Sequence, residues 1–383
     1  MATALSMLFV PVMTTAADAK PTTPGKPITV MTRNIYLGAD IQRPVTAAVI
    51  AQLSGASPTE VVFALAKATH VTREIVDDTN FPVRSELLAA EIADTKPDLV
   101  GLQEVALWRS GPLQLDQVGA PNAETVDYDF LDILLADLVD EGVEYEAVNI
   151  AARADVEAPS FAAFPGDGTE RDVRLTMRDV ILMRVDDGLR VTDSGGATFT
   201  HNLVVEILEQ PLNFTRGYNW VDVRAGSKEF RFVNTHLEAF SSDLAFAQAA
   251  QVLAEPANHS GTTILACDCN SDPLNSDIKG PPVNDTLPHK APYELITGPG
   301  GFTDQWLEFK PAEEGWTAGL SERVDDATPD RIDHRIDLIL VRTADGSDLV
   351  VDRGEVTGDE LTDRDPATGL WPSDHAGVVL RLR

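Results

Sequence analysis

Side chains that could bind a metal ion or move a proton lie at the ends of several strand-like apolar runs. They are Asn34, Glu104, His236, Asp268 with Asn270, Asp337, and the pair Asp374 and His375 near the C-terminus. Strands fix such groups rigidly, and their ends open to solvent. Carboxylates, amides and histidines gathered at one such edge would suit phosphoester chemistry assisted by a divalent metal ion.

The metal-binding candidates follow the first two strand-like runs. Glu104 ends the sequence Leu-Val-Gly-Leu-Gln-Glu, and a carboxylate after so apolar a strand must be paired, protonated or bound to metal. It is the best candidate ligand because Mg²⁺ takes only one or two protein carboxylates; a salt bridge to arginine is the alternative. Asn34 could coordinate a hard cation through its amide oxygen, although alone it would be interpreted as a turn cap.

The catalytic candidates follow later runs. Asp268 and Asn270 are two residues apart, which puts their side chains on one face of an extended backbone. There they could position a water molecule and stabilise charge on a phosphoryl oxygen, although the same pattern is typical of an Asx turn. His236 could hold a phosphate oxygen, although a lone histidine at a strand end is more often structural.

The last candidates form a histidine–carboxylate pair. A histidine oriented by a carboxylate is a common general base or phosphate-binding group. Asp374 is the neighbour of His375 in the sequence, and Asp337 could reach it from an adjacent strand. Asp333 and His334 just before Asp337 leave its register ambiguous.

Hydrophobic periodicity predicts the elements that must position these residues. Runs rich in β-branched residues predict strands, and longer amphipathic patterns between them predict helices. The strands are expected at Ile28–Thr32, Leu99–Leu102, Tyr145–Ile150, Val180–Arg184, Trp220–Val223, Phe230–Asn234, Thr263–Ala266, Ile336–Val341 and Val378–Leu382. The helices are expected at Thr59–Ile75, Val83–Thr95, Phe130–Glu141 and Ser242–Leu253. Long loops are expected at Gly111–Asp127, Arg153–Arg174 and Asn270–Pro299, and no domain boundary is evident.

Composition limits the class of protein. The chain has 383 residues, of which 43% are hydrophobic, so a sizeable core can form. Its formal net charge is −31 and its isoelectric point is about 4.4. So acidic a surface repels nucleic-acid backbones, and strong nonspecific nucleic-acid binding is not expected.

The N-terminus resembles a weakened secretory signal. An apolar run at 5–13 precedes an Ala-x-Ala cleavage pattern at Ala17–Ala19, but a basic first region is missing. Residues 1–19 are therefore predicted to be a signal peptide and 20–27 a linker. No run reaches the roughly 18 apolar residues of a membrane span, so we expect a secreted or periplasmic catalytic domain over 28–383.

The two cysteines, Cys267 and Cys269, flank Asp268. At that spacing in a strand they share a face, and a disulfide between them would be strained. A zinc site is disfavoured because no second cysteine pair exists. Both cysteines are predicted to be small buried hydrophobic residues.

Taken together, the ordered motifs resemble the endonuclease/exonuclease/phosphatase superfamily. That superfamily includes deoxyribonucleases, abasic-site endonucleases, neutral sphingomyelinases and inositol-polyphosphate 5-phosphatases. The motifs are TRNIYLG, LVGLQEV, VNTHLEA, ILACDCNSDP, RIDLILV and SDHAGVVLRL, which span Ile28 to Leu382. Asp179 stands where the family often has asparagine, and the stretch Gly38–Pro97 is longer than a minimal member needs.

The resemblance implies an α/β fold, a four-layer sandwich of two mixed β-sheets packed face to face with helices outside. It also implies phosphoester hydrolysis that depends on Mg²⁺, or on Mn²⁺ as an alternative. Asn34 and Glu104 would hold the metal, Asp268 would orient or deprotonate the attacking water, and Asn270 and His236 would stabilise the phosphoryl group. His375, oriented by Asp337 or Asp374, would act as base or bind a phosphate oxygen.

The subfamily stays open. The acidic charge disfavours a nonspecific duplex nuclease. A sphingomyelinase-like phospholipase C would make transient membrane contact through an exposed apolar loop, for which Phe161–Phe164 or Trp316 are candidates, although core packing is slightly favoured for them. A small phosphoester substrate fits equally well, and a catalytically inactive binding module is the non-enzyme alternative. We expect a monomer.

Overall fold

A computed structural model describes residues 27–185, 188–281, 283–344 and 349–383. The predicted signal peptide and nearly all of the predicted linker lie outside these residues. None of the helices in the described part is long and apolar enough to cross a membrane.

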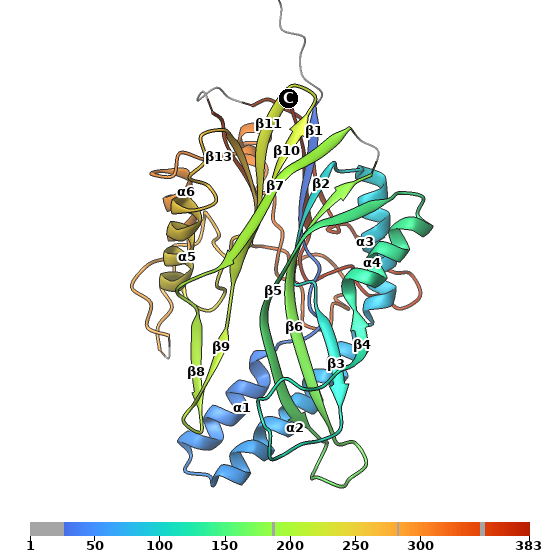
Figure 1. Cartoon of the computed structure of the whole chain (residues 1–383), viewed down its shortest axis with the longest axis vertical. Coiled ribbons are helices and arrows are strands. Elements are labelled where there is room, and N and C mark those ends of the chain that lie inside the picture. The colour runs from blue at the N-terminus through green and yellow to red at the C-terminus, as the bar shows by residue number, and fades with distance from the viewer. Residues whose placement is uncertain (1–26, 186–187, 282, 345–348) are drawn as a thin grey trace, which may run out of the picture.

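The first sheet contains the N-terminal and C-terminal strands (Figure 1). Its order is β15-β16-β1-β2-β6-β3-β4, and β5 pairs with the other edge of β6. Strands β1 and β2 are parallel, whereas the other described pairs are antiparallel, so the sheet is mixed. The bounds are β1 Ile28–Asn34, β2 Leu99–Gln103, β3 Leu107–Gly111, β4 Thr125–Asp129, β5 Tyr145–Ser160, β6 Arg171–Arg184, β15 Val351–Thr357 and β16 Gly377–Leu382.

The second sheet has the order β13-β14-β12-β11-β10-β7. Its parallel pair is β11 and β12, and the other described pairs are antiparallel. A separate hairpin is formed by β8 Leu203–Ile207 and β9 Gln210–Phe214. The sheet strands are β7 Leu189–Thr198, β10 Gly217–Ala225, β11 Lys228–His236, β12 Thr262–Asp268, β13 Thr303–Asp304 and β14 Asp337–Arg342.

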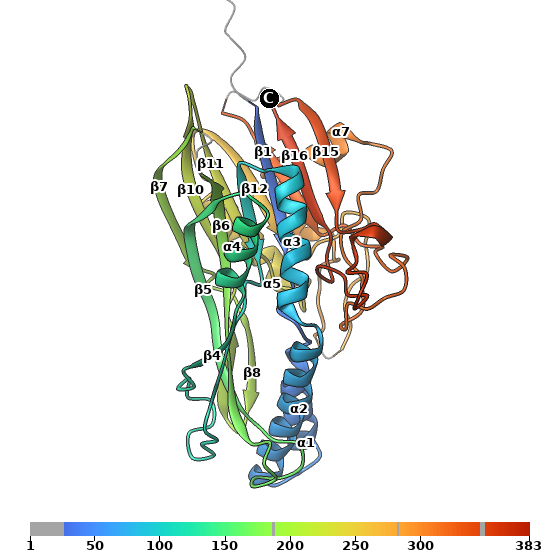
Figure 2. The same cartoon turned by 90° about the vertical axis from the view of Figure 1, so that its right-hand side faces the viewer.

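The sheets pack face to face, and helices cover their outer faces (Figure 2). Alternation along each strand produces this arrangement: Val30 of β1 packs against the second sheet, whereas its neighbour Met31 packs against the outer helices. Helices α3 Phe81–Thr95 and α4 Phe130–Asp140 cover the first sheet. Helices α5 Ser242–Ala254 and α6 Ala291–Thr297 cover the second. The predicted four-layer α/β sandwich is confirmed.

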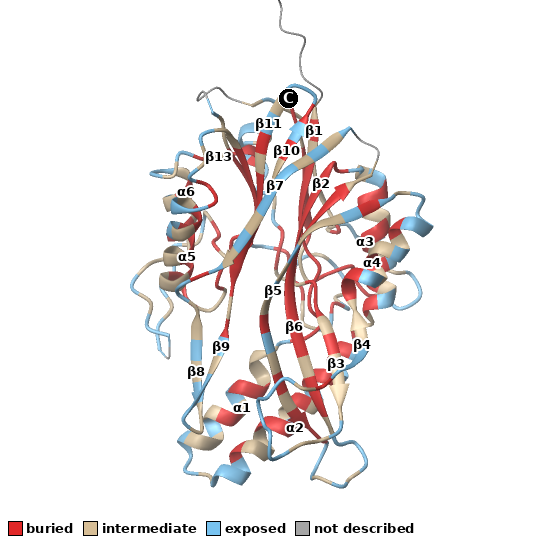
Figure 3. Ribbon diagram, viewed as in Figure 1, coloured by how far each residue is buried: buried red, intermediate tan, exposed pale blue. Residues whose placement is uncertain are grey.

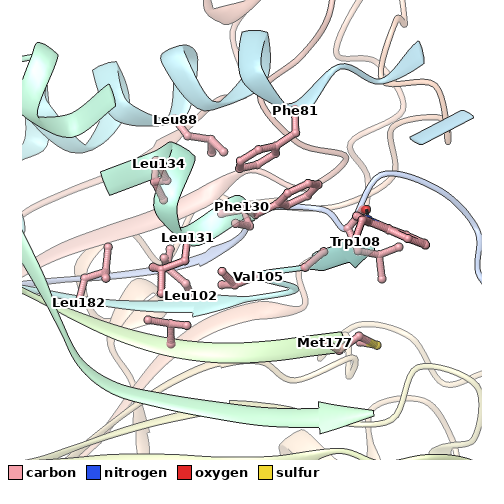
Figure 4. Packing of buried hydrophobic residues seen from close by; sticks show 14 of the residues in the cluster. Phe81, Leu88, Leu102, Val105, Trp108, Phe130, Leu131, Leu134, Met177 and Leu182 are labelled. Carbon is pink, nitrogen blue, oxygen red and sulfur yellow. Dashed lines mark hydrogen bonds between the residues drawn. The ribbon is translucent and has the colours of Figure 1, made fainter. Parts of the chain in front are cut away.

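The core under α3 and α4 shows how tightly the outer layer packs. The rings of Phe81 and Phe130 stack with centroids 3.6 Å apart, beside Leu88 and Leu134 (Figure 4). Buried residues concentrate along the central strands, whereas the ends of the hairpins are exposed (Figure 3). Helix α5 begins at a serine cap, because the Ser241 hydroxyl accepts a hydrogen bond from the Leu244 N–H.

A further group of elements extends below the sandwich (Figures 1 and 2). It consists of α1 Gln42–Leu53, α2 Pro58–Asp78, the β8–β9 hairpin and the lower ends of β5 and β6. The sequence prediction of a loop at Arg153–Arg174 is wrong, because β5 runs to Ser160 and β6 begins at Arg171. The two strands pair along most of their length, and this pairing satisfies backbone groups in a stretch whose Gly, Pro and Asp residues had suggested a loop.

Buried amides also connect the two sheets. The Asn234 side chain on β11 donates to the carbonyl oxygens of Leu102 and Val180, at 3.0 and 3.2 Å, and accepts from Gln103. These three partners belong to the first sheet. Asn149 on β5 makes comparable bonds to Gly195 and Trp220 of the second sheet, but it is partly exposed.

We therefore expect Asn234→Ala to lower the free energy of unfolding by about 1–3 kcal/mol, because it removes three buried hydrogen bonds between the sheets. Denaturant unfolding measures this loss. Asn149→Ala is the matched control, and its loss should be smaller since water can replace its amide. Equal losses for the two variants would contradict a special role for the buried bridge.

Candidate active site

The candidate residues meet at one edge of the sandwich because of strand direction. Strands β1 and β2 run in parallel, so Asn34 and Glu104 follow the same end of the first sheet. Strands β11 and β12 are also parallel, and His236 is the register partner of Asp268. Asp268 is in turn the partner of Asp337, where the antiparallel strand β14 begins.

Asp268 lies at the centre of the site and is almost fully buried. Its Oδ2 accepts from the Asn34 amide at 3.0 Å and lies 3.2 Å from His236 Nε2. Its Oδ1 accepts from the backbone N–H of Asn270 at 3.1 Å. Burial, reinforced by the charge of Asp337, raises the pKa of Asp268 to about 7. The carboxyl group is therefore able to exchange a proton near neutral pH.

His375 is oriented by Asp337. Its Nδ1 lies 2.8 Å from Asp337 Oδ2. Burial alone disfavours the imidazolium, but the charges of Asp337 and Asp374 outweigh it and raise the pKa of His375 well above its usual range. Asp333 and His334, which had left the register open, contact each other at the surface.

Glu104 and Asn34 are held by one short loop. The backbone N–H groups of Tyr36 and Leu37 donate to Asn34 Oδ1 and Glu104 Oε2, both at 2.9 Å. Tyr36, Glu104 and Asn270 all adopt positive φ angles, of 57°, 60° and 43°. Such angles are uncommon for residues other than glycine and often mark functional sites.

Asp374 is not the carboxylate that hydrogen-bonds to the His375 ring, since that partner is Asp337. Burial raises the pKa of Asp374 to about 6; the positive charge of His375 opposes this rise, and Glu104 adds to it. The Asp374 carboxylate accepts a hydrogen bond from the hydroxyl of Ser373. Asp374 therefore acts on His375 through its charge, whereas Asp337 orients the ring.

The donor set fits a divalent cation. One ligand atom each of Asp268, Asp337 and His375 lies within 4.8 Å of the others. Asp337 Oδ1 is buried and has no hydrogen-bond partner among the described residues. A buried carboxylate oxygen without a partner, beside a second carboxylate with a raised pKa, is the environment that a cation stabilises. The predicted ligands Asn34 and Glu104 also bring hard oxygen atoms to this edge.

Arg216 is a site residue that sequence reasoning missed. It is buried just before β10, and its Nη1 lies 2.7 Å from His236 Nδ1. Burial and the Arg216 charge hold the pKa of His236 well below its usual range. The contacts fit a neutral imidazole that accepts from Arg216 and donates from Nε2 to Asp268. The only signal for Arg216 in the sequence was an arginine just before a strand, in Thr215-Arg216-Gly217.

Asp179 does not add an uncompensated charge to the site. Burial raises its pKa, but Arg153 Nε lies 3.0 Å from Asp179 Oδ2 and opposes that rise. The departure from asparagine at this position is therefore balanced by an arginine on the neighbouring strand β5.

Two buried arginines fix the loops that carry the site. Arg84 donates to the carbonyl oxygens of Ile35, Tyr36 and Pro372 at 2.9–3.0 Å. Arg33 forms a salt bridge with Glu91 and also donates to the carbonyl oxygen of His375. These bonds join the segment after β1 to the segment before β16, which is why Asn34 and His375 lie close together.

The prediction for the cysteines needs correction. Cys267 and Cys269 are fully buried, as predicted, but they form a disulfide. Two residues in an extended strand would be about 6.8 Å apart, whereas these Cα atoms are 5.0 Å apart because β12 ends at Asp268 and the chain turns. That separation lies within the ordinary range for disulfides.

The aromatic candidates for membrane contact differ in burial. Phe161 is buried and packs edge-on against Phe63, so core packing is confirmed for it. Phe164 and Trp316 are exposed, at 57% and 43%.

Comparison with known proteins gives a family. Residues 76–375 match the family model described as Endonuclease/Exonuclease/phosphatase family. No curated protein matches the chain.

Solved structures show the same fold. A family protein from Leptotrichia buccalis C-1013-b is 14% identical, with a TM-score of 0.51, and the match covers 93% of this chain and 99% of that one. A family protein from Bacteroides thetaiotaomicron is 16% identical, with a TM-score of 0.52 and coverage of 94% and 98%. A mannosyl-6-phosphatase from Bacteroides thetaiotaomicron VPI-5482 is 16% identical, with a TM-score of 0.51 and coverage of 93% and 99%.

We expect Asp337→Asn to lower the pKa of His375, because the substitution removes the nearest carboxylate charge while burial persists. An NMR titration of histidine Cε1–H signals in protein freed of metal with a chelator measures the change. Asp333→Asn, which changes a surface carboxylate beside His334, is the control and should leave the His375 signal unchanged. An unaltered His375 titration in Asp337→Asn would contradict the pairing.

Proposed function

Because the chain belongs to the endonuclease/exonuclease/phosphatase family, we propose that it hydrolyses phosphoester bonds with the help of a divalent metal ion. One observation carries the proposal. A buried aspartate, Asp268, is held by Asn34, His236 and the backbone of Asn270, beside a histidine that Asp337 orients. This arrangement offers a proton acceptor, hydrogen-bond donors and cation ligands within one small volume.

The attacking water would be activated at Asp268, because the raised pKa of His375 makes that imidazole a proton donor rather than a base. A raised carboxyl pKa of about 7 lets Asp268 accept the proton of the water as its oxygen bonds to phosphorus. The bond from phosphorus to the leaving oxygen breaks, and the electron pair departs with that oxygen. His375, charged over a wide pH range, would donate to a phosphoryl oxygen or return a proton to the leaving group.

Three further groups would stabilise negative charge on the phosphoryl oxygens. The guanidinium of Arg216 and the amide of Asn270 are donors fixed by the fold: Arg216 contacts His236, and the Asn270 amide donates to the carbonyl oxygen of Leu237. His236 is kept neutral by burial and by Arg216, so it acts as a hydrogen-bonding group. Preorganised donors of this kind lower the barrier because they need no reorganisation during reaction.

The metal is proposed to be Mg²⁺, with Mn²⁺ as an alternative. Glu104 and Asn34 would hold it, and the Asp268–Asp337–His375 group is a second position, which would take a cation once His375 has lost its proton. When bound, the ion supplies Lewis-acid stabilisation of the phosphoryl oxygens and the leaving oxygen.

The net charge of the protein affects which substrates can bind. A net charge of −31 opposes long polyanions such as duplex DNA, so a nonspecific nuclease is disfavoured. A phosphomonoester or phosphodiester with few charges suits the site better. An inactive binding module is disfavoured because each motif position retains a side chain competent for catalysis.

We also propose that the protein is secreted or periplasmic and monomeric. The disulfide between Cys267 and Cys269 supports an oxidising compartment, where such bonds persist. The acidic surface is compatible with a soluble monomer, since like charges oppose self-association.

We expect Asp268→Asn and His375→Ala each to reduce turnover by roughly 10²–10⁴-fold. Bis-p-nitrophenyl phosphate and p-nitrophenyl phosphate, assayed with Mg²⁺, are suitable substrates. The surface variants Asp333→Asn and His334→Ala are matched controls and should keep full activity. Circular dichroism verifies folding, and turnover that survives either site substitution in a folded protein would refute the assignment.

Glu104→Gln is expected to raise the Mg²⁺ concentration needed for half-maximal activity on the order of tenfold or more, because an amide is a weaker ligand than a carboxylate. Calorimetric Mg²⁺ titration gives a second readout without substrate. Glu86→Gln, an exposed glutamate on α3, is the control. An unchanged metal titration would show that Glu104 is not a ligand.

A further inference from the structure

An apolar cavity of about 370 Å³ lies in the lower part of the molecule. Its walls come from α1, α2, the β8–β9 hairpin, the lower halves of β5 and β6, and β3, elements that Figure 1 shows together below the sandwich. Its volume lies within the range of roughly 300–1,000 Å³ that is typical of ligand pockets. The buried apolar side chains in its wall include Val45, Leu65, Trp108, Val173, Leu175 and Phe214.

The buried polar side chains in the wall are already engaged by the protein, whereas Gln210 is exposed. Glu157 accepts hydrogen bonds from the backbone N–H groups of Asn122 and Ala123, both at 2.7 Å. The Thr69 hydroxyl donates to the carbonyl oxygen of Leu65, and the Thr72 hydroxyl accepts from Arg43. A sugar or nucleobase in this cavity would lose its hydrogen bonds to water without replacement, whereas a hydrocarbon chain would lose none.

Two wall residues link the cavity to the catalytic residues. Phe214 is two residues from Arg216, so their Cα atoms are at most about 7 Å apart, and Arg216 contacts His236. On the other side, the Trp108 indole donates to the carbonyl oxygen of Leu37, whose N–H donates to Glu104. The cavity wall and the groups that would bind the phosphoryl moiety are therefore close in space.

We infer that this cavity binds the hydrocarbon chain of the substrate, which makes the substrate an amphiphilic phosphoester with its phosphoryl group at Asp268 and His375. The inference rests on the proposed phosphoester hydrolysis. The cavity opens to solvent, so its apolar wall is in contact with water, and a hydrocarbon ligand that covers this wall gains hydrophobic free energy.

A homologous series of alkyl p-nitrophenyl phosphates tests the inference by kinetics. Water attacks phosphorus, p-nitrophenolate leaves with the electron pair of its P–O bond, and the alkyl chain stays on the phosphate. From methyl to octyl, kcat/KM should rise roughly two- to fourfold per methylene. All assays stay below the critical micelle concentration, and a parallel arm presents the octyl ester in phosphatidylcholine vesicles, which distinguishes a dissolved chain from a membrane-borne one.

Ala158→Phe fills the cavity, since Ala158 lies in its wall. It should lower the octyl-to-methyl ratio of kcat/KM at least tenfold. Ala163→Phe makes the same chemical change at an exposed position between β5 and β6 and should leave the ratio unchanged. A ratio that is flat in the native protein, both for dissolved esters and in vesicles, would overturn the inference.

A binding experiment separates this inference from the proposed activity. 9,10-Dibromostearate quenches tryptophan on contact, and Trp108 lines the cavity. Quenching that is saturable in the native protein and lost in both Trp108→Phe and Ala158→Phe supports a chain site even if no ester is hydrolysed, which would refute only the activity. Hydrolysis of the methyl ester with no quenching and no chain-length dependence supports the activity and overturns the chain site.

Discussion

Negative charge gathered in a buried space is the constraint on which the rest of this structure depends. Asp268, Asp337 and Asp374 are close enough that each influences the ionisation of another group in the site. Water is largely excluded, so the charges need compensation from His375, from fixed N–H donors or from a cation. Two local features contribute to this compensation. They are the positive φ angles of site residues and the buried arginine beside a neutral histidine.

The geometry of the sandwich brings the compensating groups to the buried carboxylates. One parallel pair in each sheet brings two strand ends to the same edge, and face-to-face packing then places those two edges together. Amides such as Asn234 cross between the sheets close to this edge, where an apolar interior alone would let the layers slide. The precision of the site is thus a property of sheet register more than of the loops.

The sandwich itself was implied by the resemblance of the motifs to the family, whereas its strands were located by local patterns. Apolar runs located nine strands but not β3, β4, β7, β8, β9, β13 or β15. Strand-end polar residues identified Asn34, Glu104 and Asp268 as neighbours in space. These patterns missed Arg216 because nothing local distinguishes an arginine that turns inward. The hairpin beyond Arg153 was mistaken for a loop because its Gly, Pro and Asp residues are typical of turns, although β5 pairs with β6 from Ser160 and Arg171 onward. The cysteine pair was misjudged because the turn after Asp268 shortens their separation.

The hydrogen bonds from Arg84 and Arg33 to the main chain affect how the site can evolve. Arg84 and Arg33 bind main-chain carbonyl groups of the site loops, and every residue type carries such a group. The loops can therefore exchange side chains by mutation while their backbones stay where they are. Proteins with this scaffold can therefore acquire new substrates through substitutions at loop positions, while the arrangement of the catalytic centre is kept.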